Sequence, residues 1–210
     1  MTAKGKDEPE LSFAGAAEWN AWLKSHHAQR GGVVLRIPKK MGLKAGFSYA
    51  DAVESALAWG WIDGQKWTLD ATAWLQRFTP RTAKSPWSKI NRAKAEALIA
   101  AKKMRPPGLA EVERARRDGR WERAYDGAKT STVPEDLAAA LAKSARARKF
   151  FEGLDGANRY AILYRVQTAK RPETRAERIT RFVAMCGRGE TIHPPRRAKA
   201  PAPKKTRAVK

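Results

Sequence analysis

The chain has 210 residues and carries 43 Lys and Arg against 21 Asp and Glu, a formal net charge of +22. This length allows one large domain or two small ones, and a hydrophobic fraction of 42% with eight tryptophans excludes an intrinsically disordered chain. No apolar run approaches the ~20 residues of a membrane-spanning helix, and residues 1–10 lack the apolar stretch of a secretory signal. We therefore expect a cytoplasmic protein without a transmembrane segment.

The excess of positive charge favours partners that are polyanions, namely nucleic acid, anionic lipid or acidic protein surfaces. A basic proteome is the other explanation, because abundant Ala and Arg are typical of a GC-rich bacterial genome. The single cysteine, Cys186, excludes an intrachain disulfide and a metal site with several thiolates. It has helical spacing with Ile179 and Phe182, so we expect a buried thiol on an apolar face.

The first eighty residues alternate between helical and strand-like patterns. Trp19 and Leu23 have the four-residue spacing of an amphipathic helix, and a β-branched run that follows them is typical of a strand. Ser48 and Asp51 have the spacing of a capping box, and Gly60 is a natural stop for the helix that they begin. The sequence predicts a helix over 15–27, a strand over 33–37, a helix over 48–60, and a hairpin with strands over 61–69 and 72–79.

Beyond Pro86 the pattern becomes helical. Ser88 and Asp155 are suitable N-cap residues, and Pro172 stands in the first turn of a further helix. The predicted helices cover residues 88–102, 106–119, 137–141, 143–153, 159–169 and 172–187.

These elements predict an α+β fold class, with a small N-terminal α/β unit that has a short antiparallel sheet over 11–85. A mainly helical C-terminal region over 86–190 is expected to pack on it. Residues 1–10 and the basic Pro/Ala/Lys tail 191–210 are expected to be disordered, because they cannot bury apolar area. The tail resembles those that bind DNA nonspecifically through phosphate contacts, and it equally suits a solubilising extension.

Aromatic and basic residues are concentrated in the middle of the chain. Five of the eight tryptophans lie within residues 59–87, and the segment between Asp70 and Glu96 carries six cations and no acid. Large rings beside unneutralised cations suit either a rigid core next to a basic surface or a groove for an anionic or aromatic ligand. Asp63, beside Trp61, is either a desolvated base or a turn aspartate that accepts from backbone N–H groups.

The sequence contains no HExxH, CxxC, P-loop, GxSxG or dinucleotide-binding glycine motif. His26 and His27 are adjacent, so on a helix their side chains point about 100° apart and do not form a metal site by themselves. We therefore predict no catalytic residues, no cofactor and no metal. A binding protein is favoured, and catalytic activity is left open.

A series of short motifs gives a family resemblance. The motifs are Trp59-Gly60-Trp61-Ile62-Asp63-Gly64-Gln65, Leu75-Gln76-Arg77-Phe78-Thr79-Pro80-Arg81, Ser85-Pro86-Trp87-Ser88-Lys89-Ile90-Asn91, Gly119-Arg120-Trp121, Tyr164-Arg165-Val166-Gln167-Thr168-Ala169-Lys170 and Pro172-Glu173-Thr174-Arg175. In this order they resemble the bacterial YdeI/OmpD-associated family over roughly residues 11–190. The resemblance implies a link to bacteriocin protection, envelope stress and antimicrobial-peptide tolerance, and it carries over no catalytic residues. A strongly cationic chain repels cationic peptides, so direct sequestration of such peptides is physically unfavourable.

The leading hypothesis is a non-enzymatic cytoplasmic binding protein of the YdeI/OmpD-associated type. Its aromatic and basic cleft would take an anionic ligand or an acidic protein surface, with rings giving shape and cations selecting charge. The residues predicted to line the cleft are Trp61, Asp63, Gln65, Arg77, Arg81, Trp87 and Lys89.

The alternative hypothesis is a nucleic-acid-binding protein. Cations of the Arg77–Lys94 segment and of the tail would contact phosphates, while Phe78 and Trp87 would stack on unpaired bases. The further residues predicted for this function are Lys84, Arg92, Lys94, Arg196, Arg197, Lys199, Lys204 and Lys205.

Overall fold

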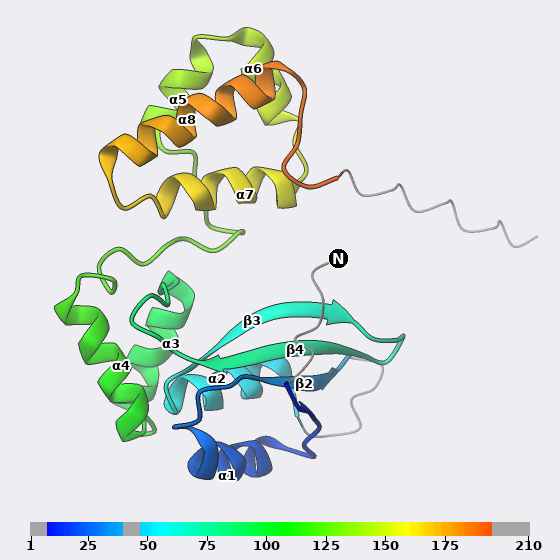
Figure 1. Ribbon diagram of the computed structural model, residues 1–210, viewed down its shortest axis with the longest axis vertical. Coiled ribbons are helices and arrows are strands. Elements are labelled where there is room, and N and C mark those ends of the chain that lie inside the picture. Colours follow the sequence, from blue (N-terminus) through cyan, green and yellow to red (C-terminus); the bar gives the residue numbers. More distant parts are fainter. Residues whose placement is uncertain (1–7, 40–46, 195–210) are drawn as a thin grey trace, which may run out of the picture. The chain divides into compact units, whose positions relative to one another are not determined.

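The computed structural model describes residues 8–39 and 47–194, and the chain divides into two compact units, residues 1–127 and 128–210 (Figure 1). The described residues form eight helices and a four-stranded sheet, which confirms the predicted α+β class. The division between the units falls after Gly127, whereas the sequence placed the change from the α+β unit to the helical region after residue 85.

Unit 1 contains the sheet, in which the strand order is β1-β2-β4-β3. Strand β1 runs parallel to β2, and the other neighbouring pairs are antiparallel. The predicted capping box opens α2, where the Ser48 side chain accepts from the Asp51 N–H and Asp51 accepts from the Ser48 N–H at 2.9 Å. The elements are β1 (Glu10–Leu11), α1 (Ala16–His26), β2 (Val33–Pro38), α2 (Tyr49–Ala58), β3 (Trp61–Thr68), β4 (Ala73–Pro80), α3 (Lys89–Ala100) and α4 (Pro106–Arg117).

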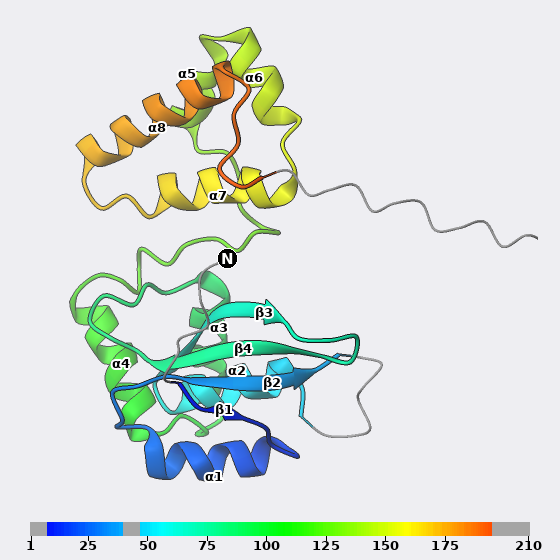
Figure 2. The ribbon, with the colours of Figure 1, turned by 45° about the vertical axis from the view of Figure 1, so that its right-hand side comes forward.

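Helices α1 and α2 cover one face of the sheet, and the main core of unit 1 lies between these layers (Figure 2). Trp19 of α1 is fully buried there, and its Nε1 donates to the Ala52 carbonyl oxygen of α2 at 3.1 Å. Leu98 of α3 and Val112 of α4 join the same core, because each helix has an apolar face that must be buried. This packing explains why unit 1 extends past the boundary expected from the sequence.

The segment before α1 is partly ordered, although residues 1–10 were expected to be disordered. Glu10 lies in β1 opposite Val34 of β2, and the Pro9 carbonyl oxygen accepts from the Val34 N–H at 2.9 Å. The Glu8 carboxylate pairs with the Arg77 guanidinium, which holds the pKa of Glu8 below its ordinary value, mainly through their hydrogen bond. Edge pairing and this ion pair therefore correct the expectation of disorder for residues 8–10.

Gly108 lies in α4 directly against the C-terminal end of α2. A Cβ atom at this position would come within 2.3 Å of the Ala58 carbonyl oxygen and 2.6 Å of Met104 Sδ. We expect Gly108→Ala to reduce the free energy of unfolding of unit 1 by about 1–3 kcal/mol, because the backbone carbonyl has to move. Urea unfolding measures the loss. Gly31→Ala is the matched control, since a Cβ there meets nothing within 4 Å; equal losses in both variants would contradict the close packing.

Unit 2 consists of four helices around a separate apolar core that includes Leu137, Ile162 and Phe182. Asp155 caps α7 as predicted, accepting from the Asn158 N–H at 2.7 Å. Cys186 is 1% exposed, so the predicted burial of its thiol is confirmed, and this burial raises the pKa of the thiol. The elements are α5 (Glu135–Ala142), α6 (Ala145–Glu152), α7 (Gly156–Gln167) and α8 (Pro172–Gly187).

Arg175 connects three helices of unit 2. Its Nε and Nη2 donate to the two carboxylate oxygens of Asp136 in α5 at 2.6 and 2.9 Å, and its Nη1 donates to the Val166 carbonyl oxygen of α7 at 2.9 Å. The hydrogen bonds from Arg175 hold the pKa of Asp136 below its ordinary value. A guanidinium that makes both contacts aligns α8 against its neighbours.

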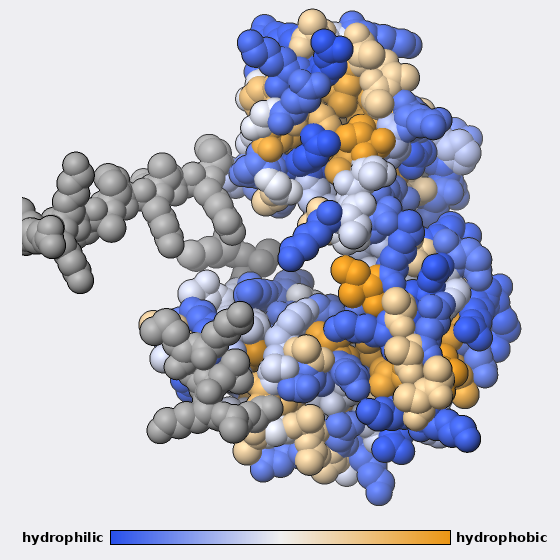
Figure 3. All heavy atoms as spheres, turned by 180° about the vertical axis from the view of Figure 1, so that it is seen from behind, coloured by the Kyte–Doolittle hydropathy of each residue, from blue (hydrophilic) through white to orange (hydrophobic). Residues whose placement is uncertain are grey.

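Side chains on the face drawn in Figure 3 are mostly hydrophilic in both units, with apolar residues in small groups. Ile90 and Leu109 of unit 1 are among the exposed large apolar side chains. Over the part of the chain that the structure describes, every helix is too short or too polar to cross a lipid bilayer.

Candidate functional site

Trp61, the first of the predicted cleft residues, lies in the core of unit 1. Its side chain is fully buried, and its Nε1 donates to the His27 carbonyl oxygen at 3.1 Å. The rings of Trp19 and Trp22 meet it at steep angles, with centroids 6.3 and 5.7 Å away. An indole enclosed in this way stabilises the fold and presents no face to a ligand in this conformation.

Asp63 lies within β3, opposite Phe78 of β4, rather than in the turn considered from the sequence. It accepts a hydrogen bond of 2.6 Å from the Tyr49 hydroxyl of α2. Burial, followed by this bond to Asp63, raises the pKa of the Tyr49 phenol. Gln65 is exposed and lies within the register shift of β3 between Asp63 and Lys66, and its Oε1 accepts from Arg77 Nη1 at 3.4 Å.

Arg77 and Lys89 are each neutralised by a carboxylate. Arg77 precedes the buried Phe78 in β4, so it projects from the opposite face of the sheet, where it pairs with Glu8. Lys89, at the first position of α3, lies 2.8 Å from Asp126 Oδ1. The structure therefore brings Arg77 to Gln65 and, as described below, Arg81 to Trp87, whereas the Trp61 side chain is enclosed in the core.

The residues predicted for nucleic-acid binding have different surroundings. Lys84 is exposed, Lys94 is half-buried, and Arg92 donates to the Trp121 carbonyl oxygen at 3.3 Å. Phe78 and Trp87 are 0% and 2% exposed. This burial contradicts the expectation that their rings stack on unpaired bases. Arg196, Arg197, Lys199, Lys204 and Lys205 lie outside the described residues.

Arg81 and Trp87 form the one direct cation–ring contact among the predicted cleft residues that the structure describes. The guanidinium carbon of Arg81 is 3.6 Å from the centre of the Trp87 ring, and the edge of that indole meets Trp121 with centroids 4.8 Å apart. Arg81 follows the last residue of β4, and its N–H donates to the Gly60 carbonyl oxygen at 2.9 Å. These contacts hold a planar cation against an aromatic wall.

The Arg81 guanidinium is buried but largely unpartnered. The residue is 6% exposed, and within the described part of the chain its guanidinium makes one hydrogen bond, from Nη1 to the Pro86 carbonyl oxygen at 3.2 Å. Its Nε and Nη2 are buried without a hydrogen-bond partner, as are Trp87 Nε1 and Arg120 Nη2. Of the six side-chain nitrogens in this state among the described residues, four therefore belong to Arg81, Trp87 and Arg120.

Arg120 reaches the same place from the segment after α4. Its Nη1 donates to the Ser85 carbonyl oxygen at 2.8 Å, next to the Pro86 carbonyl oxygen that Arg81 binds. Its Nε is neutralised by Asp118 at 2.8 Å. Arg120 is not among the residues predicted for the site, although it falls within the Gly119-Arg120-Trp121 motif, which is the signal that could have identified it.

The surroundings of Arg81 disfavour its charged form. Burial is the main cause that lowers its pKa from the ordinary arginine value to about 10, and the nearby Arg120 charge adds to the effect. The carboxylates of Glu111 and Asp63 act in the opposite direction, but each is hydrogen-bonded to another residue, Arg114 and Tyr49 respectively. At neutral pH the site is thus a buried positive charge with unpaired N–H donors, which is the chemistry that binds an oxyanion.

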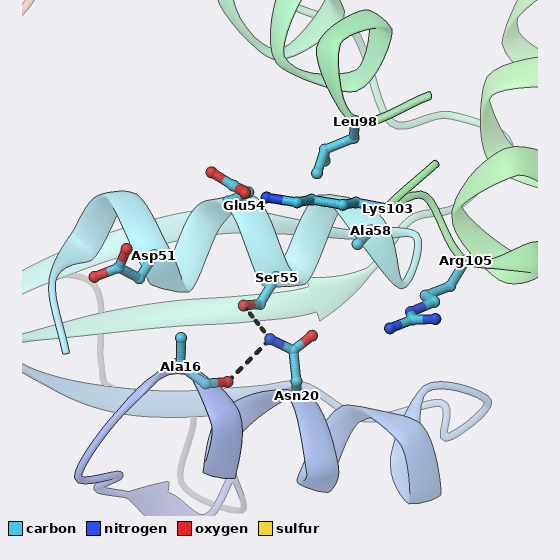
Figure 4. A pocket seen from close by; sticks show the side chains of 9 residues that line it. All are labelled: Ala16, Asn20, Asp51, Glu54, Ser55, Ala58, Leu98, Lys103 and Arg105. Carbon is cyan, nitrogen blue, oxygen red and sulfur yellow. Dashed lines mark hydrogen bonds between the residues drawn. The ribbon is translucent and has the colours of Figure 1, made fainter. Parts of the chain in front are cut away.

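A pocket of about 410 Å³ lies elsewhere in unit 1, between α1, α2 and the connection from α3 to α4 (Figure 4). Asn20 bridges the two helices at its floor, because its Nδ2 donates to the Ala16 carbonyl oxygen at 2.9 Å and to Ser55 Oγ at 2.8 Å. Arg105 begins the far wall, and its N–H donates to the Ala58 carbonyl oxygen at 3.1 Å. The pocket therefore reaches the C-terminal end of α2. Gly60, whose carbonyl oxygen accepts from the Arg81 N–H, follows that end by two residues.

The two adjacent histidines make local contacts. His26 Nδ1 lies 2.8 Å from the Trp22 carbonyl oxygen and its ring stacks on Trp22 with centroids 4.3 Å apart, while His27 Nδ1 lies 3.1 Å from the Lys24 carbonyl oxygen. Within residues 8–39 and 47–194, no group of three or more His, Cys, Asp or Glu side chains is placed to hold a metal ion.

The two units match different protein families. Residues 130–189, which make up most of unit 2, match the family described as Bacteriocin-protection, YdeI or OmpD-Associated, which confirms the resemblance in this part of the chain. Residues 11–111 match a family described as Domain of unknown function (DUF8412), so the motifs before Gly119 fall in a different family from the one expected. No curated protein and no solved structure matches the chain.

Proposed function

We propose that the protein is a binding protein whose N-terminal unit takes a small oxyanion at Arg81. The observation that supports this proposal is the buried Arg81 guanidinium, whose Nε and Nη2 have no partner and which lies beside the unpaired donors of Trp87 and Arg120. Burying an unpaired charge costs several kcal/mol, and a fold retains such a group more readily where a ligand neutralises it. The predicted anionic ligand is kept, and of the two arginines predicted to bind it, Arg77 and Arg81, we place it at Arg81.

The donor geometry favours a planar or tetrahedral oxyanion, such as a carboxylate or a phosphate monoester. A guanidinium offers Nε–H and Nη2–H in parallel, which matches two oxygens of such a group, and the indole N–H of Trp87 supplies a neutral donor nearby. Stacking on Trp87 fixes the plane of the Arg81 fork. An oxyanion that accepts from this fork would therefore be oriented as well as neutralised.

A ligand would reach Arg81 by displacing the loop over residues 82–86. This loop is held toward the site by two bonds, from Arg81 to the Pro86 carbonyl and from Arg120 to the Ser85 carbonyl. Lys84 is exposed on the same loop and adds a cation at the entrance. An anion that replaces these carbonyls as acceptor would release the loop without leaving either guanidinium unpaired.

At the level of the cell, we propose that ligand binding by unit 1 serves the protection named in the family description of unit 2. Survival of a strain that lacks the protein, exposed to a bacteriocin, would then be restored by the wild-type chain and not by an Arg81 variant. A strongly basic chain does not attract basic peptides, so the ligand is an anion rather than the toxin itself.

The anion site is tested with Arg81→Met, which keeps much of the apolar contact with Trp87 and removes the charge. We expect phosphate or citrate to stabilise the wild type, by about 2.7 kcal/mol at a hundredfold excess over Kd, and to leave Arg81→Met unchanged. Thermal unfolding at increasing concentrations of each anion, with chloride at matched ionic strength, measures the effect.

Arg77→Met is the matched control, because it removes the same charge from a residue that already has a carboxylate partner. It should retain the anion-dependent stabilisation. Equal stabilisation of wild type and Arg81→Met would overturn the proposal, and loss in Arg77→Met alone would return the ligand to the cleft first predicted from the sequence.

A further inference from the structure

The pocket of Figure 4 is lined by side chains of both charges. Glu54 and Asp51 project from the first two turns of α2, while Lys103 and Arg105 project from the connection between α3 and α4. Four charged groups around one small recess predict a ligand that bears both signs of charge. The volume of about 410 Å³ falls within the range of small-molecule sites.

The charged side chains of this pocket do not form ion pairs with one another. Among the described residues, the side chains of Glu54 and Lys103 take part in no ion pair or hydrogen bond, and the Arg105 guanidinium has one contact, 6.0 Å from the centre of the Trp59 ring. Asp51 is committed to the capping box through its Oδ2. Glu54, Lys103 and Arg105 are therefore the charged side chains that remain available to a ligand.

The neutral polar groups of the pocket, Asn20 and Ser55, are held in place by hydrogen bonds. Asn20 uses its Nδ2 on Ala16 and Ser55, and its Oδ1 accepts from Trp59 Nε1 at 3.2 Å, so its amide is fully engaged. Ser55 Oγ accepts from Asn20, which leaves its own O–H as a donor toward the recess (Figure 4). Leu98 adds an apolar wall. The pocket thus has a rigid floor, one hydroxyl and three charged side chains that form no ion pair among the described residues.

The spacing of the backbone positions from which the acidic and basic side chains project can be counted along α2. Arg105 is bonded through its N–H to the Ala58 carbonyl oxygen, four residues after Glu54 and seven after Asp51. A rise of 1.5 Å per residue puts these positions about 6 and about 10 Å apart along α2. An α-amino acid holds its two charges closer than this, whereas each extended peptide residue spans about 3.5 Å.

We infer that this pocket binds the two charged ends of a short peptide of two or three residues. The terminal ammonium lies toward Glu54, with Asp51 adding negative charge, and the terminal carboxylate pairs with Arg105. Lys103 adds positive charge to the lining of the same pocket. This inference is independent of the anion site, because it uses neither Arg81 nor its neighbours.

The test is isothermal titration of the full chain with Ala-Ala and Ala-Ala-Ala. Each is compared with its N-acetylated form and with its C-terminal amide, which remove one charge at a time. We expect the free peptides to bind and each blocked form to lose about tenfold or more in affinity, as for the loss of one charge-assisted contact. Blocked peptides that bind as well as the free ones would overturn the inference, as would an absence of binding by both free peptides.

Two exposed substitutions locate the site. Glu54→Gln and Arg105→Gln should each weaken Ala-Ala binding about tenfold or more, and the first should matter little for Ala-Ala with an acetylated N-terminus. Glu113→Gln and Arg117→Gln are the matched controls, because both side chains are exposed on α4 outside the pocket. Arg81→Met should keep full peptide affinity, which separates this result from the outcome for the anion site. Unchanged binding in both pocket variants would overturn the assignment.

Discussion

Replacing Trp61 with Ala should reduce the free energy of unfolding of unit 1 by about 3–5 kcal/mol, the usual cost of removing a buried aromatic side chain. The indole is fully buried, and its Nε1 is satisfied by the His27 carbonyl oxygen. Truncation leaves a cavity against Trp19 and Trp22 and leaves that carbonyl without its donor. Urea unfolding followed by circular dichroism measures the change.

Trp67→Ala is the control for this substitution, since Trp67 lies on the same strand and is only half-buried. Its loss should be clearly smaller than that of Trp61→Ala. If the two losses were equal, and Trp61→Ala instead abolished anion binding in a folded protein, Trp61 would be a ligand contact rather than a core residue.

Arg81→Met should make the ligand-free protein more stable than the wild type at neutral pH. Below about pH 10 the Arg81 guanidinium is charged in both the folded and the unfolded chain, so the folded state bears the full cost of burying it. Above about pH 10, and below the ordinary pKa of arginine, the folded protein releases this proton while the unfolded chain keeps it. The unfolded state then binds more protons, and wild-type stability rises with pH.

The advantage of Arg81→Met, on the order of 3 kcal/mol below the folded pKa, should therefore shrink by about 1.4 kcal/mol for each pH unit above it. Unfolding in a chloride buffer at about pH 9 and about pH 11 checks this, because Lys and Tyr titrations affect both variants alike. The variant could instead be less stable than the wild type at neutral pH, by an amount that does not change with pH. That result would show that burial of the Arg81 charge does not destabilise the folded state.

Most of the secondary structure could be predicted because its signals are local. The capping box at Ser48 and Asp51 and the cap at Asp155 depend on residues three apart, and each forms as expected. The extent of unit 1 could not be predicted in this way. Leu98 and Val112 have helical spacing whichever core they join. Their packing in three dimensions determines that they belong to the core of unit 1.

The candidate site was less predictable, because Arg77 and Arg81 look alike in the sequence. Strand alternation turns Arg77 away from the core to meet Glu8, a partner from a segment expected to be disordered. Arg81 lies one residue beyond β4, where the chain bends back toward Gly60 and carries its side chain inward. Arg120, far along the chain, completes the group through a loop contact that no local pattern encodes.

One corner of unit 1 supports both recesses. At the C-terminal end of α2, the carbonyl of Ala58 anchors the backbone of Arg105, and the carbonyl of Gly60 anchors the backbone of Arg81. A shift of this corner on filling one recess would alter the affinity of the other. Thermodynamic linkage makes such an influence mutual: whatever factor the anion imposes on the peptide, the peptide must impose on the anion.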